Sequence, residues 1–235
     1  IKILPANVSF DERRREMFLK EAKLASSISD PHIVEIHDFA REDDLDFIVM
    51  EYIEGTPLSD IIRGRPMAPD RIVELGAQIA GALSSAHRKR LLHRDLKPAN
   101  ILVNDEGLLK IVDFGVAAAA SSGGTDLTKT GYVIGSPKYM APEQILGKKV
   151  DETADIYSIG VIMYEMATGI PPYSRGDHMS VMYQHVQGKA KQCQEVNPKI
   201  SDEFAAIIEK AMSVDKTKRF QSMEELTDAL DAITI

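Results

Sequence analysis

Cysteine pairs and long apolar runs are both missing from this sequence of 235 residues. Cys193 is the only cysteine, which excludes an internal disulfide and is typical of a reducing compartment such as the cytoplasm. No apolar run approaches the ~18 residues that a membrane-spanning helix needs, so we expect no membrane span in this chain. We also expect no signal peptide, because residues 1–5 (Ile-Lys-Ile-Leu-Pro) are typical of the end of a strand.

An excess of basic residues is missing as well. The chain has 28 Lys and Arg against 36 Asp and Glu, a net charge of −8 and no basic stripe, which argues against general nucleic-acid binding. Hydrophobic residues make up 44% and charged residues 27%, as in ordinary globular proteins. Without internal repeats or an obvious linker, this length fits one large domain or two tightly joined lobes.

Residues 93–100 (His-Arg-Asp-Leu-Lys-Pro-Ala-Asn) are the most informative stretch, because residues 113–115 (Asp-Phe-Gly) follow eighteen residues after Asp95 (113 − 95). Asp95 can accept or orient a proton, and Lys97 and Asn100 can face the same small volume from one tight loop. The second aspartate precedes a glycine that lets the backbone turn. A carboxylate, an amide and a base around one point suit a magnesium polyphosphate with a hydroxyl nucleophile beside it.

Both stretches match the signature of protein kinases, H-R-D-L-x-x-x-N and D-F-G, without a substitution. Residues 141–143 (Ala-Pro-Glu) complete the set 30 residues after Asp113 (143 − 113). The chain therefore resembles a eukaryotic-like (Hanks-type) protein kinase from Ile1 to about Ile233. Residues 128–136 and 180–186 are similar to the corresponding segments of bacterial receptor-type Ser/Thr kinases.

This resemblance implies an α+β, bilobal fold. Residues 1–53 would form a partial N-lobe that begins at the third strand and ends at the hinge, and that consists of an antiparallel sheet plus one helix. Residues 54–235 would form the larger, mainly helical C-lobe. The glycine-rich strand–turn–strand that such kinases place before the strand lysine is not in this sequence. We interpret the chain as a fragment, with a naturally shortened kinase-fold protein as the alternative, and expect these residues alone to bind ATP weakly.

Periodicity predicts the individual elements. A helix should follow Pro5, with a capping box formed by Ser9 and Glu12, and end before Pro31. The other expected elements are strands at 33–39 and 47–52, a helix at 70–89, a hairpin of 101–103 and 109–112, and helices at about 153–168, 178–187, 201–213 and 222–231.

Glu21 lies on the apolar face of the first helix, where a carboxylate needs a partner. The apolar residues on that face are Phe18, Leu24, Ala25 and Ile28. Lys2 is the natural partner, because kinases pair a strand lysine with a helix glutamate and the lysine then holds the α/β-phosphates; a Glu that merely reaches solvent is the alternative. The resemblance also implies that Met50 is the gatekeeper and that Glu51 to Ile53 offer backbone groups to adenine.

The resemblance assigns chemistry to four residues of the large lobe. Asp95 would orient and deprotonate the substrate hydroxyl, and Lys97 would contact the γ-phosphate of ATP. Asn100 and Asp113 would ligate Mg²⁺, with Mn²⁺ as an alternative. Leu-Lys-Pro after His-Arg-Asp is similar to Ser/Thr kinases rather than tyrosine kinases, although dual specificity stays open.

Arg94 adjoins the catalytic aspartate, where an arginine can pair with a phosphorylated activation-loop residue. The expected recipients are Thr128 and Thr130, in a stretch whose Ser, Gly and Thr content is typical of a mobile loop. They could instead be loop filler.

Four further residues are expected to have structural roles. Glu143 should pair with Arg219, Asp155 should hold the backbone of the catalytic loop, and His93 should pack under the D-F-G turn.

Two other functions compete with a protein Ser/Thr kinase. A kinase-fold binding module would have lost its chemistry, yet Lys2, Asp95 and Asp113 are all present. A small-molecule kinase would usually lack A-P-E and a threonine-bearing segment, and both are here. The implied partners are protein substrates, with a kinase-domain dimer left open. The implied location is the cytoplasm, with the cytoplasmic part of a membrane-anchored kinase as a variant.

Overall fold

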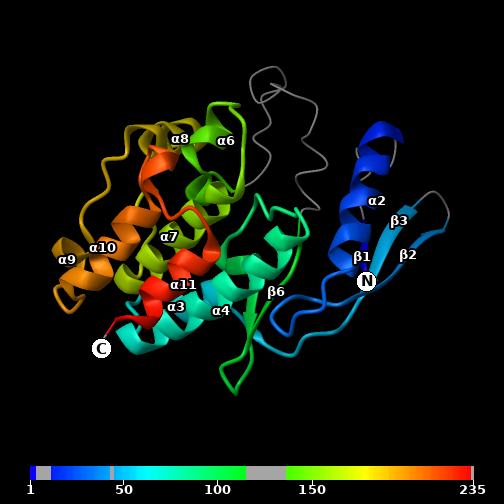
Figure 1. The fold of residues 1–235 in the computed structure, drawn as a ribbon, viewed down its shortest axis with the longest axis horizontal. Helices are drawn as coiled ribbons and strands as arrows, with labels where there is room; N and C mark the ends of the chain where they lie inside the picture. The colour runs from blue at the N-terminus through cyan, green and yellow to red at the C-terminus, as the bar shows by residue number, and fades with distance from the viewer. Residues whose placement is uncertain (4–11, 43–44, 115–135, 234–235) are drawn as a thin grey trace.

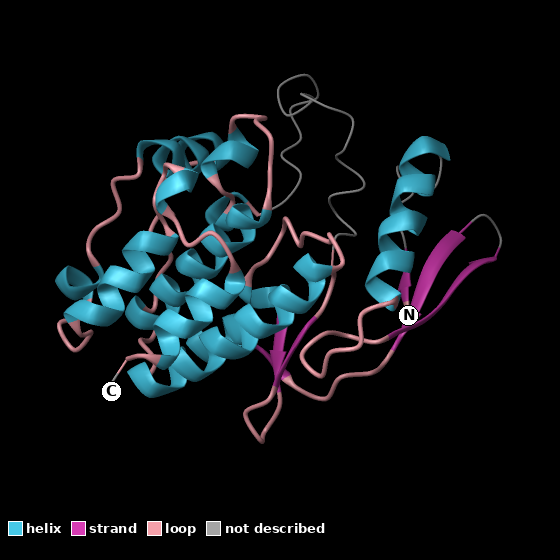
Figure 2. Cartoon of the chain, viewed as in Figure 1, coloured by secondary structure: helices cyan, strands magenta, loops and turns pink. Residues whose placement is uncertain are grey.

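The computed structural model describes residues 1–3, 12–42, 45–114 and 136–233 (Figure 1). For residues 13–15, 17, 18 and 21 it describes the backbone alone. A small lobe of sheet and one helix stands beside a larger lobe that is mainly helical (Figure 2). The expected α+β, two-lobed fold is therefore confirmed.

The small lobe holds a three-stranded antiparallel sheet in the order β1-β3-β2, with β1 (Lys2–Ile3), β2 (Ile36–Glu42) and β3 (Leu45–Met50). Pairing of β1 with β3 places Lys2 opposite Ile48, whose side chain is fully buried. Helix α2 (Glu12–Ser26) lies against β2. The capping box predicted at Ser9 lies outside the described residues.

The apolar face of α2 is only partly as predicted. Ala25 and Ile28 are buried, but Leu24 is 36% exposed. Among the described side chains of α2, the two that are buried, Ala22 and Ala25, are small.

The large lobe is organised around helix α7 (Glu152–Thr168), in which every residue except Glu152 and Glu165 is buried. Helices α4 and α10 pack on α7, and α11 packs on α4. The helices of this lobe are α3 (Leu58–Ile62), α4 (Pro69–Arg88), α6 (Pro142–Ile145), α7 (Glu152–Thr168), α8 (His178–Gln187), α9 (Cys193–Val196), α10 (Asp202–Ala211) and α11 (Met223–Asp231), with short 3-10 turns η1 (Pro98–Asn100), η2 (Pro137–Tyr139) and η3 (Lys216–Lys218).

Local capping explains why α8, α10 and α11 begin within a residue of their predicted starts. Asp177, Ser201 and Ser222 each accept a hydrogen bond from a backbone N–H in the first turn of α8, α10 and α11. Helix α10 ends two residues before the expected 213. The four- and five-residue helices α3, α6 and α9 were not predicted, because so short a segment carries no periodicity. Among the described helices, none is long and apolar enough to cross a membrane.

A second small sheet lies where the two lobes meet. Its strand order is β4-β5-β6, with β4 (Thr56–Pro57), β5 (Ile101–Val103) and β6 (Leu109–Ile111). The chain before β2 is bonded to this sheet, since Ile111 N–H donates to His32 (2.8 Å) and Val34 N–H donates to Ile111 (3.0 Å). The strand predicted at 33–39 therefore starts later, at Ile36, because Ile33 and its neighbours pair across the lobes instead.

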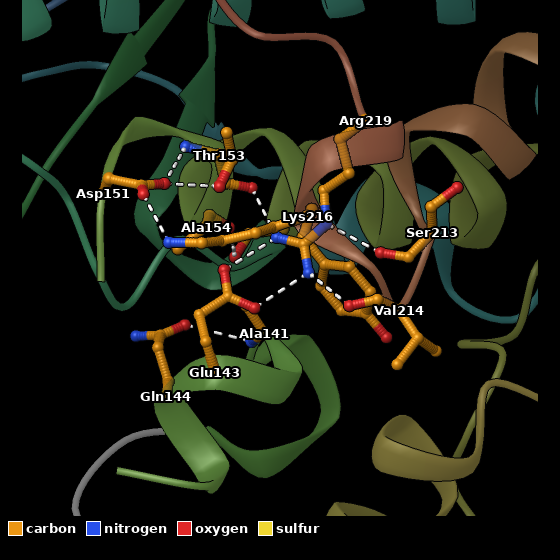
Figure 3. A network of polar contacts seen from close by, with 12 residues as sticks. Ala141, Glu143, Gln144, Asp151, Thr153, Ala154, Ser213, Val214, Lys216 and Arg219 are labelled. Atoms are coloured by element: carbon orange, nitrogen blue, oxygen red, sulfur yellow. Dashed lines mark hydrogen bonds and ion pairs between the residues drawn. The ribbon is translucent and has the colours of Figure 1, made fainter. Parts of the chain in front are cut away.

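A buried ion pair fastens α6 to the end of the large lobe, as predicted (Figure 3). Arg219 Nη1 and Nη2 donate to the two carboxylate oxygens of Glu143 at 2.7 and 2.8 Å. The remaining Arg219 donors reach the backbone carbonyls of Thr153, Ser213 and Val214. With every polar group on the pair satisfied, the burial of two charges is tolerated.

Glu143→Ala should lower the free energy of unfolding by about 3–5 kcal/mol, because it leaves Arg219 charged and buried without its partner. Lys216→Met is the matched control, since the neighbouring Lys216–Asp151 pair (2.6 Å) is partly exposed and should contribute ~1 kcal/mol or less. Urea unfolding of both variants measures the difference. Equal losses in the two variants would contradict the assignment.

A buried histidine on α8 makes the large lobe sensitive to acid. His185 is fully buried, and its Nδ1 lies 2.8 Å from the Tyr157 hydroxyl. Burial lowers the pKa of His185 from the ordinary 6.5 to about 4. Between these values the unfolded chain binds a proton that the folded protein excludes, so stability falls as the pH drops from 6.5 to 4.

Across that window His185 should cost the fold about 3 kcal/mol. His185→Asn keeps a polar atom facing Tyr157 but does not titrate. Chemical unfolding of both proteins from pH 7.5 to 4.5 should therefore show a shallower loss of stability in the variant. Parallel profiles would show that His185 is not the group responsible.

Candidate active site

The catalytic loop predicted at residues 93–100 lies between α4 and β5 and contains Asp95. One carboxylate oxygen of Asp95 is 3.1 Å from Lys97 Nζ, and the other accepts the backbone N–H of Ser136 at 3.0 Å. Asn100 Nδ2 donates to the Asp95 carbonyl at 3.2 Å. The structure thus brings together the aspartate, lysine and amide that the sequence placed at one point.

Asp155, near the start of α7, binds the backbone of this loop, as predicted. Its carboxylate accepts the backbone N–H groups of His93 and Arg94, both at 2.9 Å, and also contacts His87 Nε2 at 2.8 Å. Burial alone would raise the pKa of the Asp155 carboxyl, but the bond from His87, the nearby imidazoles and the backbone donor outweigh it and lower the pKa. The carboxylate is therefore ionised, which keeps it an acceptor only.

His93 packs under the second motif. It is buried, and its ring lies 4.9 Å from that of Phe114, which confirms the predicted structural position. Burial lowers the pKa of His93, so the ring is neutral. A neutral buried ring next to an aromatic side chain supports the loop by packing.

Asp113 lies at the meeting point of the lobes. Its φ of 68° is a left-handed backbone conformation that non-glycine residues rarely adopt. The preceding Val112 donates its N–H to the Asn100 carbonyl at 2.8 Å, which ties the two predicted metal ligands to one hairpin. Lys2 Nζ, carried by β1, is 2.6 Å from Asp113 Oδ1. The predicted partner Glu21 has its side chain outside the described part of the chain, so that pair stays a prediction.

The two groups predicted to hold a metal have suitable chemistry. Asn100 uses its Nδ2 on the Asp95 carbonyl and has an amide oxygen as a second polar atom, and Asp113 supplies a carboxylate. Amide and carboxylate oxygens are what Mg²⁺ prefers. The observed Lys2–Asp113 contact shows that this carboxylate takes a cationic partner. The residues therefore fit a magnesium ion.

The hinge predicted at residues 50–53 follows β3. Met50 and Ile53 are half-buried, and the Glu51 N–H donates to the Glu35 carbonyl at 3.0 Å. The Glu51 carboxylate bonds Lys110 Nζ (2.6 Å) and the Glu35 N–H (2.7 Å). Burial would raise the pKa of Glu51, but these two bonds lower it.

Sequence reasoning missed three residues that contact this site. Lys110 was treated only as part of an expected strand, and His87 only as part of the expected helix at 70–89. Gln144, whose Nε2 donates to the Arg94 carbonyl at 2.8 Å, was not singled out at all. None belongs to a motif, and the partners are far away in the sequence. Thr128 and Thr130, the predicted phosphorylation sites, lie outside the described residues.

Two lobes with an aspartate, a lysine and the side chains of an asparagine and a second aspartate near their junction are typical of phosphoryl-transfer kinases. Residues 1–230 match the protein kinase domain family. The chain therefore belongs to the protein kinase family. Its curated relatives include serine/threonine-protein kinase PrkC of Bacillus subtilis, 37% identical over 227 residues, and PknB of Mycobacterium tuberculosis, 35% identical over 231 residues. They place it among Hanks-type serine/threonine kinase domains, as predicted.

Each alignment covers 96% of this chain but only 35% and 37% of those two proteins, so the chain spans about a third of the length of the curated relatives it matches. Among solved structures, the PknI kinase domain of Mycobacterium tuberculosis matches with a TM-score of 0.76 at 25% identity, over 97% of this chain and 82% of that one. Rad53 1–466 in complex with AMP-PNP gives the same TM-score at 26% identity, over 91% of this chain and 54% of that one.

Proposed function

We propose that this chain transfers the γ-phosphoryl group of ATP to serine and threonine hydroxyls of protein substrates. The observation that carries the proposal is the Asp95 carboxylate, held by Lys97 on one oxygen and by the Ser136 N–H on the other. The printed names of the relatives, serine/threonine-protein kinases, support the substrate class. The AMP-PNP bound to Rad53 supports an adenine nucleotide as donor.

Asp95 would accept the proton of the attacking hydroxyl. Its two contacts hold the carboxylate in place, so that it can align a hydroxyl and take its proton as the new phosphate ester bond forms. Lys97, within reach of the same carboxylate, would balance negative charge on the group being transferred.

Lys2, Asn100 and Asp113 would bind the nucleotide phosphates and Mg²⁺. The ion, when bound, would neutralise charge on the phosphate oxygens. Lys2 would then move its contact from Asp113 to the α/β-phosphates, which makes the observed pair a resting arrangement. At the hinge, Glu51 and Ile53 would offer backbone groups to adenine, with Met50 at the pocket wall.

Several finer assignments belong to the same proposal. Arg94 would receive a phosphate on Thr128 or Thr130 and so switch the enzyme on. The lobes would divide between residues 53 and 54. We also propose that the protein lies in the cytoplasm and that two kinase domains can form a dimer.

Full-length protein incubated with Mg-ATP should acquire phosphate on Thr128 or Thr130, whereas Asp95→Asn should not. Phosphosite mapping by mass spectrometry reads the outcome. Phosphate on neither protein, with both folded, would argue for a binding module or for a kinase that another enzyme must activate.

Asp113→Asn and Lys2→Met should each reduce phosphoryl transfer to background while the melting temperature stays close to wild type, because both side chains are partly exposed. The matched controls are Asp105→Asn and Lys89→Met, the same chemical changes at exposed positions with no assigned role in the site. Peptide phosphorylation and thermal unfolding measure the two effects. Retained turnover in either site variant would mean that the metal or phosphate ligand is misassigned.

A further inference from the structure

The side-chain amide of Gln144 joins two backbone segments that are far apart in the sequence. Its Oε1 accepts the N–H of Ala141 at 3.0 Å, a contact drawn in Figure 3, and its Nε2 donates to the Arg94 carbonyl at 2.8 Å. The first bond fixes the amide within α6. The second reaches the residue directly before Asp95.

Arg94 needs such support. Its φ of 61° places a non-glycine residue in the left-handed region, which persists only where the surroundings impose it. Asp155 holds the Arg94 N–H at 2.9 Å, and Gln144 holds its carbonyl. Side chains from two different helices therefore hold both backbone polar groups of this one residue.

The Arg94 carbonyl belongs to the peptide group that connects Arg94 to Asp95. That peptide group is planar, so a bond to its oxygen also limits rotation at the Asp95 end. Asp95 is held a second time, through its carboxylate, by the N–H of Ser136. The stretch from Ser136 to Gln144 thus holds Asp95 once by its side chain and once by the preceding backbone.

Gln144 itself has a rigid base. Its neighbour Glu143 is bonded through both carboxylate oxygens to the buried Arg219. Helix α6 therefore cannot shift without breaking that pair, and the position of the Gln144 amide follows from it.

We propose that Gln144 is a positioning residue for phosphoryl transfer, which fixes the Arg94–Asp95 peptide so that the Asp95 carboxylate faces the substrate hydroxyl. This inference rests on the proposed function. Gln144 would touch neither substrate nor nucleotide; it would act through the backbone of the catalytic loop.

Gln144→Glu is a sharp test, because the carboxylate has the shape of the amide and still accepts the Ala141 N–H, but cannot donate to the Arg94 carbonyl. We expect kcat to fall about tenfold or more, since small displacements of a catalytic group are costly, with the KM for ATP changed less than about twofold. Gln187→Glu, at an exposed position on α8, controls for the added charge. Gln144→Met, neutral and of similar size, should reproduce the loss of kcat and guards against misfolding of the first variant.

Hydrogen–deuterium exchange of residues 93–97 provides a readout that needs no turnover. Both Gln144 variants should exchange these amides faster than wild type, at an unchanged melting temperature. Wild-type kcat and wild-type exchange in both variants would overturn the proposal. If wild type and Asp95→Asn are equally inactive, the proposed function fails, and the exchange comparison alone decides whether Gln144 positions the loop.

Discussion

The active site depends first on one buried negative charge, the Asp155 carboxylate. A carboxylate inside a protein persists only when donors surround it, and here two backbone N–H groups of the catalytic loop and His87 supply them. Asp155 stands on α7, the most buried helix of the large lobe. The loop that carries Asp95 is therefore attached directly to the core, so its geometry is as well determined as the core packing.

A second set of contacts holds the same loop through the segment from Ser136 to Gln144. The Glu143–Arg219 pair fixes α6, and the residues around it reach the loop through Ser136 and Gln144. Arg94, whose backbone is left-handed, lies between the two sets. Strain at a single residue is thus balanced by charged and polar groups whose own positions are set by burial, which is the arrangement that preorganised catalysis requires.

The small lobe reaches the large one through fewer contacts. Lys2 meets Asp113, the residues around Ile33 pair with β6, and Glu51 meets Lys110. Strand pairing places Lys2, because β1 lies beside the buried Ile48. These links bring Lys2, Asp113 and Glu51, the proposed phosphate-binding, metal-binding and hinge residues, to the junction of the two lobes.

Motifs predicted the centre of the site well, because catalytic groups on one short loop keep their spacing whatever surrounds them. Asp95, Lys97 and Asn100 converge as expected, and Asp155, His93 and the Glu143–Arg219 pair lie where the resemblance implied. Gln144, Lys110 and His87 escaped notice, since each acts on a partner tens of residues away and no local pattern marks them. The start of β2 was predicted too early for a similar reason. The apolar residues near Ile33 could pair with a strand of either lobe, and only the tertiary packing determines that they pair with β6.

The sequence by itself determined the family, the positions of the long helices and the groups available for chemistry, because capping, periodicity and motif spacing are local properties. The tertiary structure alone decided which groups face one another: Lys2 with Asp113, Ser136 with Asp95 and Gln144 with Arg94. These contacts join segments that meet only after the buried surfaces of α4, α6 and α7 have packed, and no spacing along the chain specifies a distance across a core.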